Sequence, residues 1–382
     1  MEFLESFNAC VTETPIGYED NANGKSFQLY GEDLRCLDSG QPMMCVFEYE
    51  ADIQTTVDNA KSFFQTTLDS PKNQIDYTAS IKRIGQNEFI YEKNRTVDEY
   101  IMTTNEINPY KMYKLFNRKT QLMQLVFSKN AKVCVSVWNH SVYDGITFQT
   151  LGYRLFGKEP YPNQPIKHPD LLTKKLCLVR TILDLPNIGT ISQLSEYKDL
   201  DEPTFISTEL SLANIKQIKN AESVTFASVT TSKFLENCFK SLPESVDCLK
   251  TFVSVHIDNP NRFNNYSIIP IVVHRNKCTP KDINALFAEN QFHVFGFHEL
   301  FRTNLLTNLK SNMTTRFDPD VIFSSMRNND EIGDAKLKRI LVHNFSSKAK
   351  IYGCGIQCGT DNFYIQSSIR TSAIDLEKYI DT

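Results

Sequence analysis

Apolar residues recur along this 382-residue chain in two patterns, one with the period of a strand and one with the period of a helix. The run 43–50 is apolar and predicts a strand. The segment after it predicts a helix, because its apolar residues return at helical spacing, at Ile53, Val57, Ala60, Phe64 and Leu68. In the run 132–140 the period of two predicts a strand that places His140 on the face of Trp138. A second helix is expected directly after it, over 148–156.

The same alternation returns in the second half of the chain. We expect a helix over 226–242, strands over 248–258 and 266–274, and a helical region over 280–311. Closing strands are expected in 320–326, 338–345, 350–359 and 362–369, followed by a terminal helix in 372–380. Between the halves, 157–205 is rich in proline and holds a short apolar segment around 171–184. The chain therefore reads as mixed α/β, with halves 1–185 and 206–382 and a crossover at 186–205.

Composition narrows the class of protein. Hydrophobic residues make up 41%, aromatic residues 11% and charged residues 23%, which is the balance of a globular protein rather than a disordered or fibrous one. The net charge of −4 lacks the basic surplus that phosphate-backbone binding requires. We therefore expect no nucleic-acid partner.

Several features favour a reducing compartment. The ten cysteines are scattered, and some stand inside apolar strand-like runs such as KVCVSVW, as reduced buried thiols do. The acidic start MEFLESFNAC does not resemble a secretory signal, and no window approaches the ~20 apolar residues of a membrane span. Asn139-His140-Ser141 has the form of a glycosylation site, but a glycan there would block the histidine considered next. We expect a cytoplasmic protein with no membrane partner.

The segment NHSVYDG carries the chemistry. His140, Asp144 and Gly145 form an H-x-x-x-D-G pattern where a strand ends and a helix begins. By chance, a chain of this composition would hold roughly 0.015 such matches, so the pattern is moderately specific. A neutral imidazole can take the proton from an attacking hydroxyl or amine and later return it to the leaving group. We expect Asp144 to support the loop rather than touch substrate, and Gly145 to permit a tight turn or a close approach.

On these residues the chain resembles the CoA-dependent acyltransferase superfamily, which includes chloramphenicol acetyltransferase, the BAHD acyltransferases and the condensation domains of peptide synthetases. The order of later segments is similar too: SVTFASVTTSKFLENCFKSL, FVSVHIDNPNRFNNYSIIPIVV and IFSSMRNNDEIGD resemble the family's second-half helix, its strand–loop–strand and its cleft border. The resemblance spans roughly positions 40–380. Asn139 stands where condensation domains and chloramphenicol acetyltransferase carry a first histidine, and no Asp-Phe-Gly-Trp-Gly segment is present, so the chain resembles a divergent branch.

The resemblance implies two chloramphenicol-acetyltransferase-like α/β halves with mixed sheets and a tunnel at their interface. It implies His140 as general base and an acyl-CoA, most simply acetyl-CoA, as co-substrate without a metal. Ser325 is the candidate oxyanion donor, with Asn328 and Asn329 as weaker ones. The candidates for contact with CoA are four cations of the second half: Lys216, Lys219, Lys233 and Arg262.

Other motifs are weaker. Cys354 and Cys358, with His343, do not have the spacing of a zinc site, and residues four apart on a strand share one face, which favours buried thiols. His293 and His298 fit no zinc motif either.

Phosphate-loop, glycosyltransferase and hydrolase signatures also receive little support. In NGKSF the first glycine of a phosphate loop would fall at Glu19, and Asp318-Pro-Asp320 only resembles a metal-binding Asp-x-Asp pair. No G-x-S-x-G elbow occurs.

The leading hypothesis is acyl transfer, most simply of acetyl, from CoA to a hydroxyl or amine of a small acceptor such as an amino sugar or nucleotide sugar. Two alternatives stay open: a condensation-like domain that takes its acyl group from a carrier protein, and a non-catalytic binding or structural member of the fold. The oligomeric state is left open by the sequence.

Overall fold

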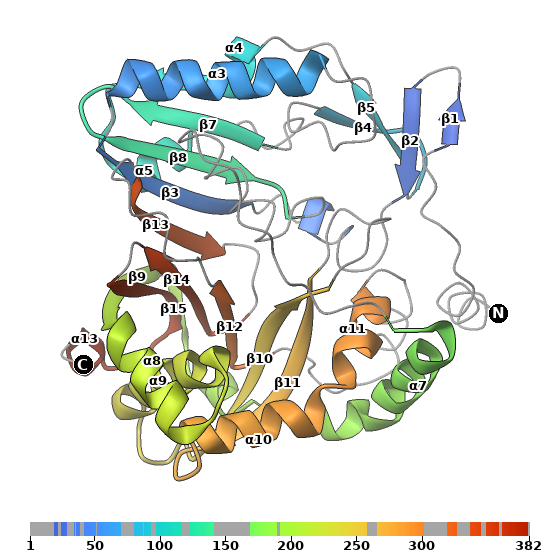
Figure 1. Ribbon diagram of the computed structural model, residues 1–382, viewed down its shortest axis with the longest axis vertical. Coiled ribbons are helices and arrows are strands. Elements are labelled where there is room, and N and C mark those ends of the chain that lie inside the picture. The colour runs from blue at the N-terminus through green and yellow to red at the C-terminus, as the bar shows by residue number, and fades with distance from the viewer. Residues whose placement is uncertain are drawn as a thin grey trace.

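In the computed structural model, the described residues form three β-sheets flanked by helices (Figure 1). It describes residues 19–21, 24–28, 34, 36–38, 42–50, 52–69, 80–86, 88–92, 97–116, 123–140, 169–188, 192–257, 266–301, 319–326, 337–344, 349–358 and 361–380. Within these ranges, none of the helices has the length and apolarity needed to cross a membrane. The mixed α/β class and the two-part architecture expected from the sequence are confirmed.

The N-terminal half is built on a five-stranded sheet with the order β13-β3-β8-β7-β6. Its strands are β3 (Met43–Tyr49), β6 (Ile101–Thr104), β7 (Met123–Ser128), β8 (Val133–Trp138) and β13 (Leu337–Asn344). The strand β13 comes from late in the chain and pairs antiparallel with β3. The first and last parts of the chain therefore share one sheet.

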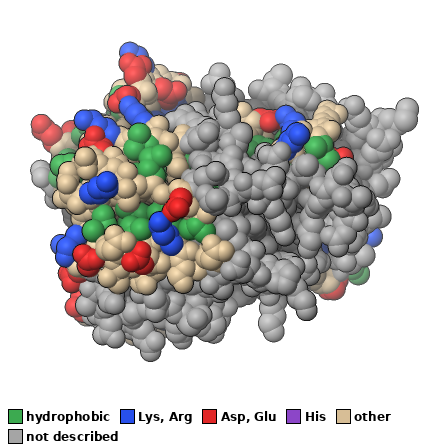
Figure 2. Space-filling view, turned by 90° about the horizontal axis from the view of Figure 1, so that it is seen from above, with side chains coloured by type: hydrophobic (Ala, Val, Ile, Leu, Met, Phe, Trp, Pro, Cys, Tyr) green, Lys and Arg blue, Asp and Glu red, His purple; other side chains and the backbone are tan. Residues whose placement is uncertain are grey.

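Helix α3 (Ile53–Asp69) covers this sheet from above and buries Val57 and Ala60. Seen from that side, the described part of the surface mixes acidic and basic side chains with apolar ones (Figure 2). Two short helices complete this half: α4 (Val97–Tyr100), and α5 (Pro109–Tyr113), which starts at the N-cap Asn108. A small sheet, β1-β2-β5-β4, lies at the opposite side of this half from α5 (Figure 1). It is formed by Glu19–Asn21 (β1), Gly24–Gln28 (β2), Ser80–Arg83 (β4) and Glu88–Glu92 (β5).

The C-terminal half is built on a six-stranded mixed sheet with the order β11-β10-β12-β14-β15-β9. The strands are β9 (Asp199–Ser211), β10 (Cys248–His256), β11 (Tyr266–His274), β12 (Val321–Met326), β14 (Ile351–Cys358) and β15 (Asn362–Thr371). The β10–β12 and β12–β14 pairs are parallel and the others are antiparallel. The sequence-based prediction located every strand of this sheet except β9.

Helices lie on both faces of the six-stranded sheet. On one face α8 (Leu212–Glu222), α9 (Phe226–Ser241), α10 (Pro280–Asn290) and the short α13 (Leu376–Ile380) enclose a C-terminal core that includes Phe234, Phe323 and Phe363. On the other face α7 (Leu171–Ile188) and α11 (His293–Phe301) pack over β10 and β11 through Leu178, Leu185, Phe252, Ile268, Phe297 and Leu300, which we call the α7–α11 core. A single turn of 3-10 helix, Gln193–Glu196, precedes β9.

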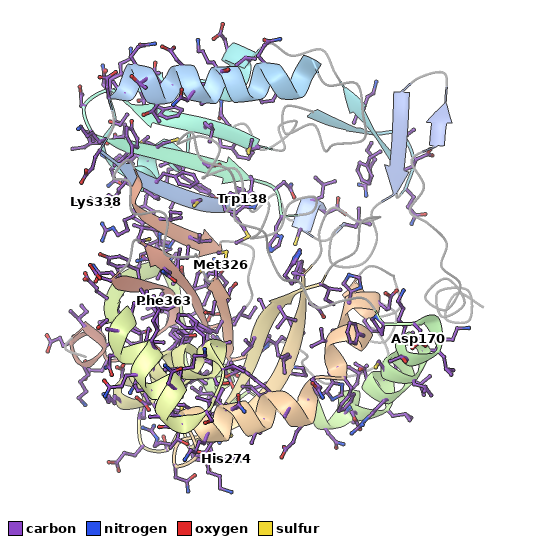
Figure 3. All side chains as sticks on the ribbon, viewed as in Figure 1. Trp138, Asp170, His274, Met326, Lys338 and Phe363 are labelled. Atoms are coloured by element: carbon purple, nitrogen blue, oxygen red, sulfur yellow. The ribbon has the colours of Figure 1, made fainter. Side chains whose placement is uncertain are left out.

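The two halves are joined by a shared hydrophobic cluster, which we call the junction core. It contains Phe47 and Trp138 from the N-terminal sheet and Tyr352 and Cys354 from β14, and Met326 of β12 packs against it. Trp138 and Met326 lie at the boundary of the halves (Figure 3). This core fixes the strand β8, and with it the residue that follows, against the second half.

Candidate active site

His140 lies two residues after the end of β8, in a turn, with its side chain half-buried. Its position follows from β8, in which Val135 and Val137 face the core around α5 and Cys134 and Trp138 face the junction core. Trp138 is fully buried and Asn139 is 7% exposed, so packing fixes the backbone as far as the residue that precedes His140. The predicted alternation along this strand is therefore confirmed.

The ring of His140 contacts the second half of the chain. Its centroid lies 4.9 Å from that of Tyr266, with an angle of 44° between the two planes. Tyr266 is the first residue of β11, on the edge of the six-stranded sheet. The histidine of the H-x-x-x-D-G pattern thus lies where a strand end of one half meets a strand start of the other.

Polar side chains of neighbouring strands lie on the same sheet face as Tyr266. His256 is directly opposite Tyr266 in the β10–β11 pair. Ser254 precedes it by two residues on the same face, and Ser324 of β12 is aligned with Ser254. These four residues were missed by the sequence analysis, because alternation assigns residues to faces and does not reveal which face meets His140.

Ser325, the predicted oxyanion donor, lies near the end of β12 and is half-buried. Its Oγ lies 3.2 Å from Oγ1 of Thr230 in α9. Ser325 therefore faces the helix layer, whereas Ser324 shares its face with Ile322 and Met326, which pack against the junction core.

The predicted CoA-contacting lysines belong to that same helix layer. Lys216 and Lys219 are half-buried on α8, and Lys233 on α9 forms an ion pair with Glu236 at 2.8 Å. Asp144, Gly145, Arg262, Asn328 and Asn329 lie outside the described residues.

The thiols of the rejected zinc motif are core residues. Cys354 and Cys358 are both buried in the junction core, on one face of β14. Burial raises the pKa of Cys354 to about 12, so the thiol form dominates. His343 is instead enclosed by aromatic rings, with Tyr110 and Phe205 as neighbours. Among the described residues no group of three or more potential metal ligands is present.

Asp320, of the Asp-x-Asp pair, is a structural acceptor. It is 1% exposed, and its carboxylate accepts from the Ser192 hydroxyl, the Leu194 amide at 3.2 Å and the Lys250 amide at 2.9 Å. These bonds tie the start of the 3-10 turn to β10. A buried carboxylate occupied in this way serves the fold.

A cavity of about 380 Å³ lies elsewhere, at the end of α7 beside α10 and α11. His293 lines it, and its Nδ1 lies 2.9 Å from the Thr181 hydroxyl. Burial lowers the pKa of His293 to about 4. The cavity borders the middle of β11, at Pro270–Val272, whereas His140 contacts the start of that strand.

No family model and no curated protein matches this sequence. Solved structures match the fold of this chain. The trichothecene 15-O-acetyltransferase TRI3 from Fusarium sporotrichioides superimposes with a TM-score of 0.65 at 12% identity, over 96% of this chain and 95% of that one. The wax ester synthase/diacylglycerol acyltransferase from Marinobacter aquaeolei VT8 gives 0.56 at 13% identity, over 93% and 96%. The starter condensation domain of rhizomide synthetase RzmA, solved with C8-CoA, gives 0.58 at 9% identity, over 93% and 91%.

The chain has the fold of the CoA-dependent acyltransferases and condensation domains. The likeness extends over nearly the whole length of both partners, so it is not limited to one half. At this identity it establishes the fold, as the resemblance in sequence predicted.

Proposed function

We propose that this protein transfers an acyl group from an acyl-CoA to a hydroxyl or amine of a small acceptor, with His140 as general base. The observation that carries the proposal is the contact of His140 with Tyr266, which places the imidazole at the meeting of the two halves. Solved proteins of this fold include enzymes named for acyl transfer and a domain bound to C8-CoA.

The chemistry needs one base that works in both directions. Neutral His140 accepts the proton of the acceptor hydroxyl or amine as that atom attacks the thioester carbonyl. The carbonyl π electrons move to oxygen, which gives a tetrahedral oxyanion. When the intermediate collapses, the C–S bond breaks, the acyl group stays on the acceptor, and His140 returns the proton to the departing sulfur.

The oxyanion needs a hydrogen-bond donor, whose loss typically costs about 3 kcal/mol of transition-state stabilisation. Ser325 is the donor proposed from the sequence, and its hydroxyl would have to leave Thr230 to act. Ser324, on the opposite face of the same strand, is the matched alternative. If Ser325 is the hydrogen-bond donor, Ser325→Ala lowers kcat about 100-fold and Ser324→Ala leaves kcat within about threefold. If instead Ser324→Ala causes the large loss of kcat, the role belongs to Ser324.

The first experiment tests the acyl donor. Calorimetric titration of the purified protein with acetyl-CoA and with free CoA should give micromolar binding, and thiol release with amines, amino sugars and alcohols then identifies the acceptor. His140→Ala should retain CoA binding and lose about 10²–10⁴ in kcat. Lys216→Ala, Lys219→Ala and Lys233→Ala test the proposed contacts with CoA phosphates. Absence of binding at millimolar acetyl-CoA would overturn the acetyl donor.

Two alternatives are distinguished by the same experiment. A condensation-like domain would accept its acyl group from a carrier protein and release no thiol from acyl-CoA; the readout is acyl transfer and not CoA binding, since a condensation domain of this fold was solved with C8-CoA. Asn139, in place of a first histidine, counts against it. A non-catalytic member of the fold would show no thiol release with any acceptor, and its biological activity would be unchanged in His140→Ala.

A further inference from the structure

Helix α7 carries a row of exposed aliphatic side chains. Leu172, Leu176, Val179 and Leu183 are 67%, 63%, 42% and 70% exposed. At about 100° per residue they lie within roughly 60° of one another on the helix circumference. We call this row the α7 stripe. Its four side chains are separated by four, three and four positions, so they form one continuous apolar strip along the helix.

The opposite side of α7 is buried against the rest of the protein. Leu178 and Leu185 belong to the α7–α11 core, and Cys177 and Thr181 are buried as well. Gly296 of α11 allows this close approach, since a Cβ there would come within 2.9 Å of the Cys177 carbonyl oxygen. The α7 stripe is therefore the exposed side of a helix whose orientation is fixed by its buried side. Figure 1 shows α7 at the outside of the molecule, next to α11.

Cations flank the α7 stripe on both sides. On the helix circumference, Lys175 lies about 70° to one side of its centre and Arg180 about 70° to the other. Asp184 lies further round, about 110° from the centre, where its carboxylate lies 3.8 Å from Arg180 and 3.7 Å from the buried His293. The Arg180 guanidinium also lies 3.4 Å from the centre of the Phe292 ring, and its side chain is 63% exposed. Long basic side chains beside an apolar strip can extend toward head groups while the strip enters the acyl region.

We propose that the α7 stripe docks this protein on an anionic phospholipid surface. An apolar strip between two cations complements a layer of hydrocarbon beneath negatively charged head groups. Sequence analysis predicted no membrane partner because no window approaches the ~20 apolar residues of a membrane span, a criterion that does not detect a helix lying on a membrane surface. The helix is 18 residues long, and its leucines divide between a buried and an exposed side.

A second copy of the chain fits the same surface less well. The α7 stripe offers roughly 400–500 Å² of apolar surface, against about 800 Å² per partner in a standard interface. If two copies paired antiparallel along their stripes, the twofold axis would bring Lys175 beside the partner copy's same lysine and Arg180 beside the same arginine. Like charges on both flanks oppose that pairing.

The test is co-sedimentation of the full chain with vesicles of phosphatidylcholine, with and without about one third phosphatidylserine. We expect binding to the anionic vesicles, weakened at least threefold by about 0.5 M salt. The double variant Leu176→Asp/Leu183→Asp should bind at least 10-fold less, and Lys175→Glu should bind several-fold less. Ile107→Asp, at a 59% exposed isoleucine in the other half, is the matched control and should bind as the wild type does.

Thermal unfolding checks that the variants are folded, since every substituted side chain is at least partly exposed. Three results would overturn the proposal: no binding to either vesicle, equal binding by wild type and the double variant, or a dimer seen by light scattering that the double variant abolishes without any vesicle binding. The last result would assign the α7 stripe to a second copy of the chain. The test uses no acyl donor, so its outcome is independent of the proposed acyl transfer.

Discussion

Arg339 of β13 donates two hydrogen bonds to the carboxylate of Glu48 on β3, from Nε at 3.1 Å and from Nη2 at 2.5 Å. The two residues are 291 positions apart in sequence and face each other across the strand pair that joins the halves. Their side chains are 32% and 25% exposed, so solvent screens the pair in part. The guanidinium also lies 5.9 Å from the centre of the Tyr364 ring of β15.

We expect Glu48→Gln to lower the free energy of unfolding by about 1 kcal/mol, because a two-point charged contact is replaced by a weaker neutral one. Urea denaturation measures the change. The matched control is Asp98→Asn, which removes the single 2.6 Å contact with Lys61 between side chains that are 77% and 44% exposed. That change should cost less than about 0.5 kcal/mol, and equal losses in the two variants would contradict the argument.

His343 should make the fold sensitive to acid. It is 1% exposed, its Nε2 lies 3.4 Å from the Tyr110 hydroxyl, and burial lowers its pKa to about 3. Between that value and an unfolded pKa near ~6.5, the unfolded chain binds a proton that the folded chain does not, so stability falls as pH falls. From pH ~7.5 to pH ~5 this one group should cost about 2 kcal/mol.

The measurement is the urea midpoint of wild type and His343→Phe at both pH values. The phenyl ring keeps the aromatic contact with Phe205 and removes the titration. The variant should lose about 2 kcal/mol less than the wild type over this range, whatever its stability at neutral pH. Parallel losses would show that His343 does not titrate in the way its burial requires.

The contact of α7 with α11 should be intolerant of a methyl group. A Cβ on Gly296 would overlap Oγ1 of Thr181 and approach the carbonyl oxygen of Cys177 at 2.9 Å. We expect Gly296→Ala to destabilise the protein by about 1–3 kcal/mol. In a double-mutant cycle, Thr181→Ala should recover part of this loss, because it removes Oγ1 while the contacts with Cβ of residue 181 at 2.6 Å and with the backbone at 2.9 Å remain. Strict additivity would exclude direct contact as the cause.

Tyr266 should act as a positioning residue for the proposed base. Tyr266→Ala removes the ring beside His140 and should lower kcat about tenfold with little change in KM, because the imidazole is less well oriented. Tyr266→Phe keeps the ring and should restore kcat to within about twofold. If Phe and Ala behave alike, the hydroxyl rather than the ring is the functional part.

Sequence periodicity predicted the strands of the C-terminal sheet better than those of the N-terminal sheet, where the fully buried strand β7 was not predicted. The strand β10 alternates between the C-terminal core and the opposite face, whereas β11 is a continuous apolar run because both of its faces are packed. The missed strand β9, Asp199–Ser211, lies on the sheet edge and is largely half-buried or exposed, so its acidic residues obscure the alternation. Helix α7 was noted only as a short apolar segment and not predicted as a helix, since leucines on both of its sides leave no polar face to mark one.

At the site, the local pattern predicted His140, whereas its surroundings depend on tertiary structure. Tyr266 and His256 come from strands of the other half, and no spacing in the sequence relates them to a histidine at the end of β8. The Asp-x-Asp pair shows the converse. Its local pattern suggested metal binding, but only the folded structure reveals that Asp320 is already occupied by one hydroxyl and two backbone amides.

The late arrival of β13 also bears on how this protein is made. Until the ribosome has synthesised nearly the whole chain, β3 has no partner on its outer side, and the unfinished N-terminal sheet exposes a buried, apolar edge. Contacts between such distant segments form slowly, and an open edge of this kind invites pairing with other nascent chains. A chain released before residue 337 would therefore be prone to aggregate, and its recovery in soluble form would depend on chaperones that shield β3.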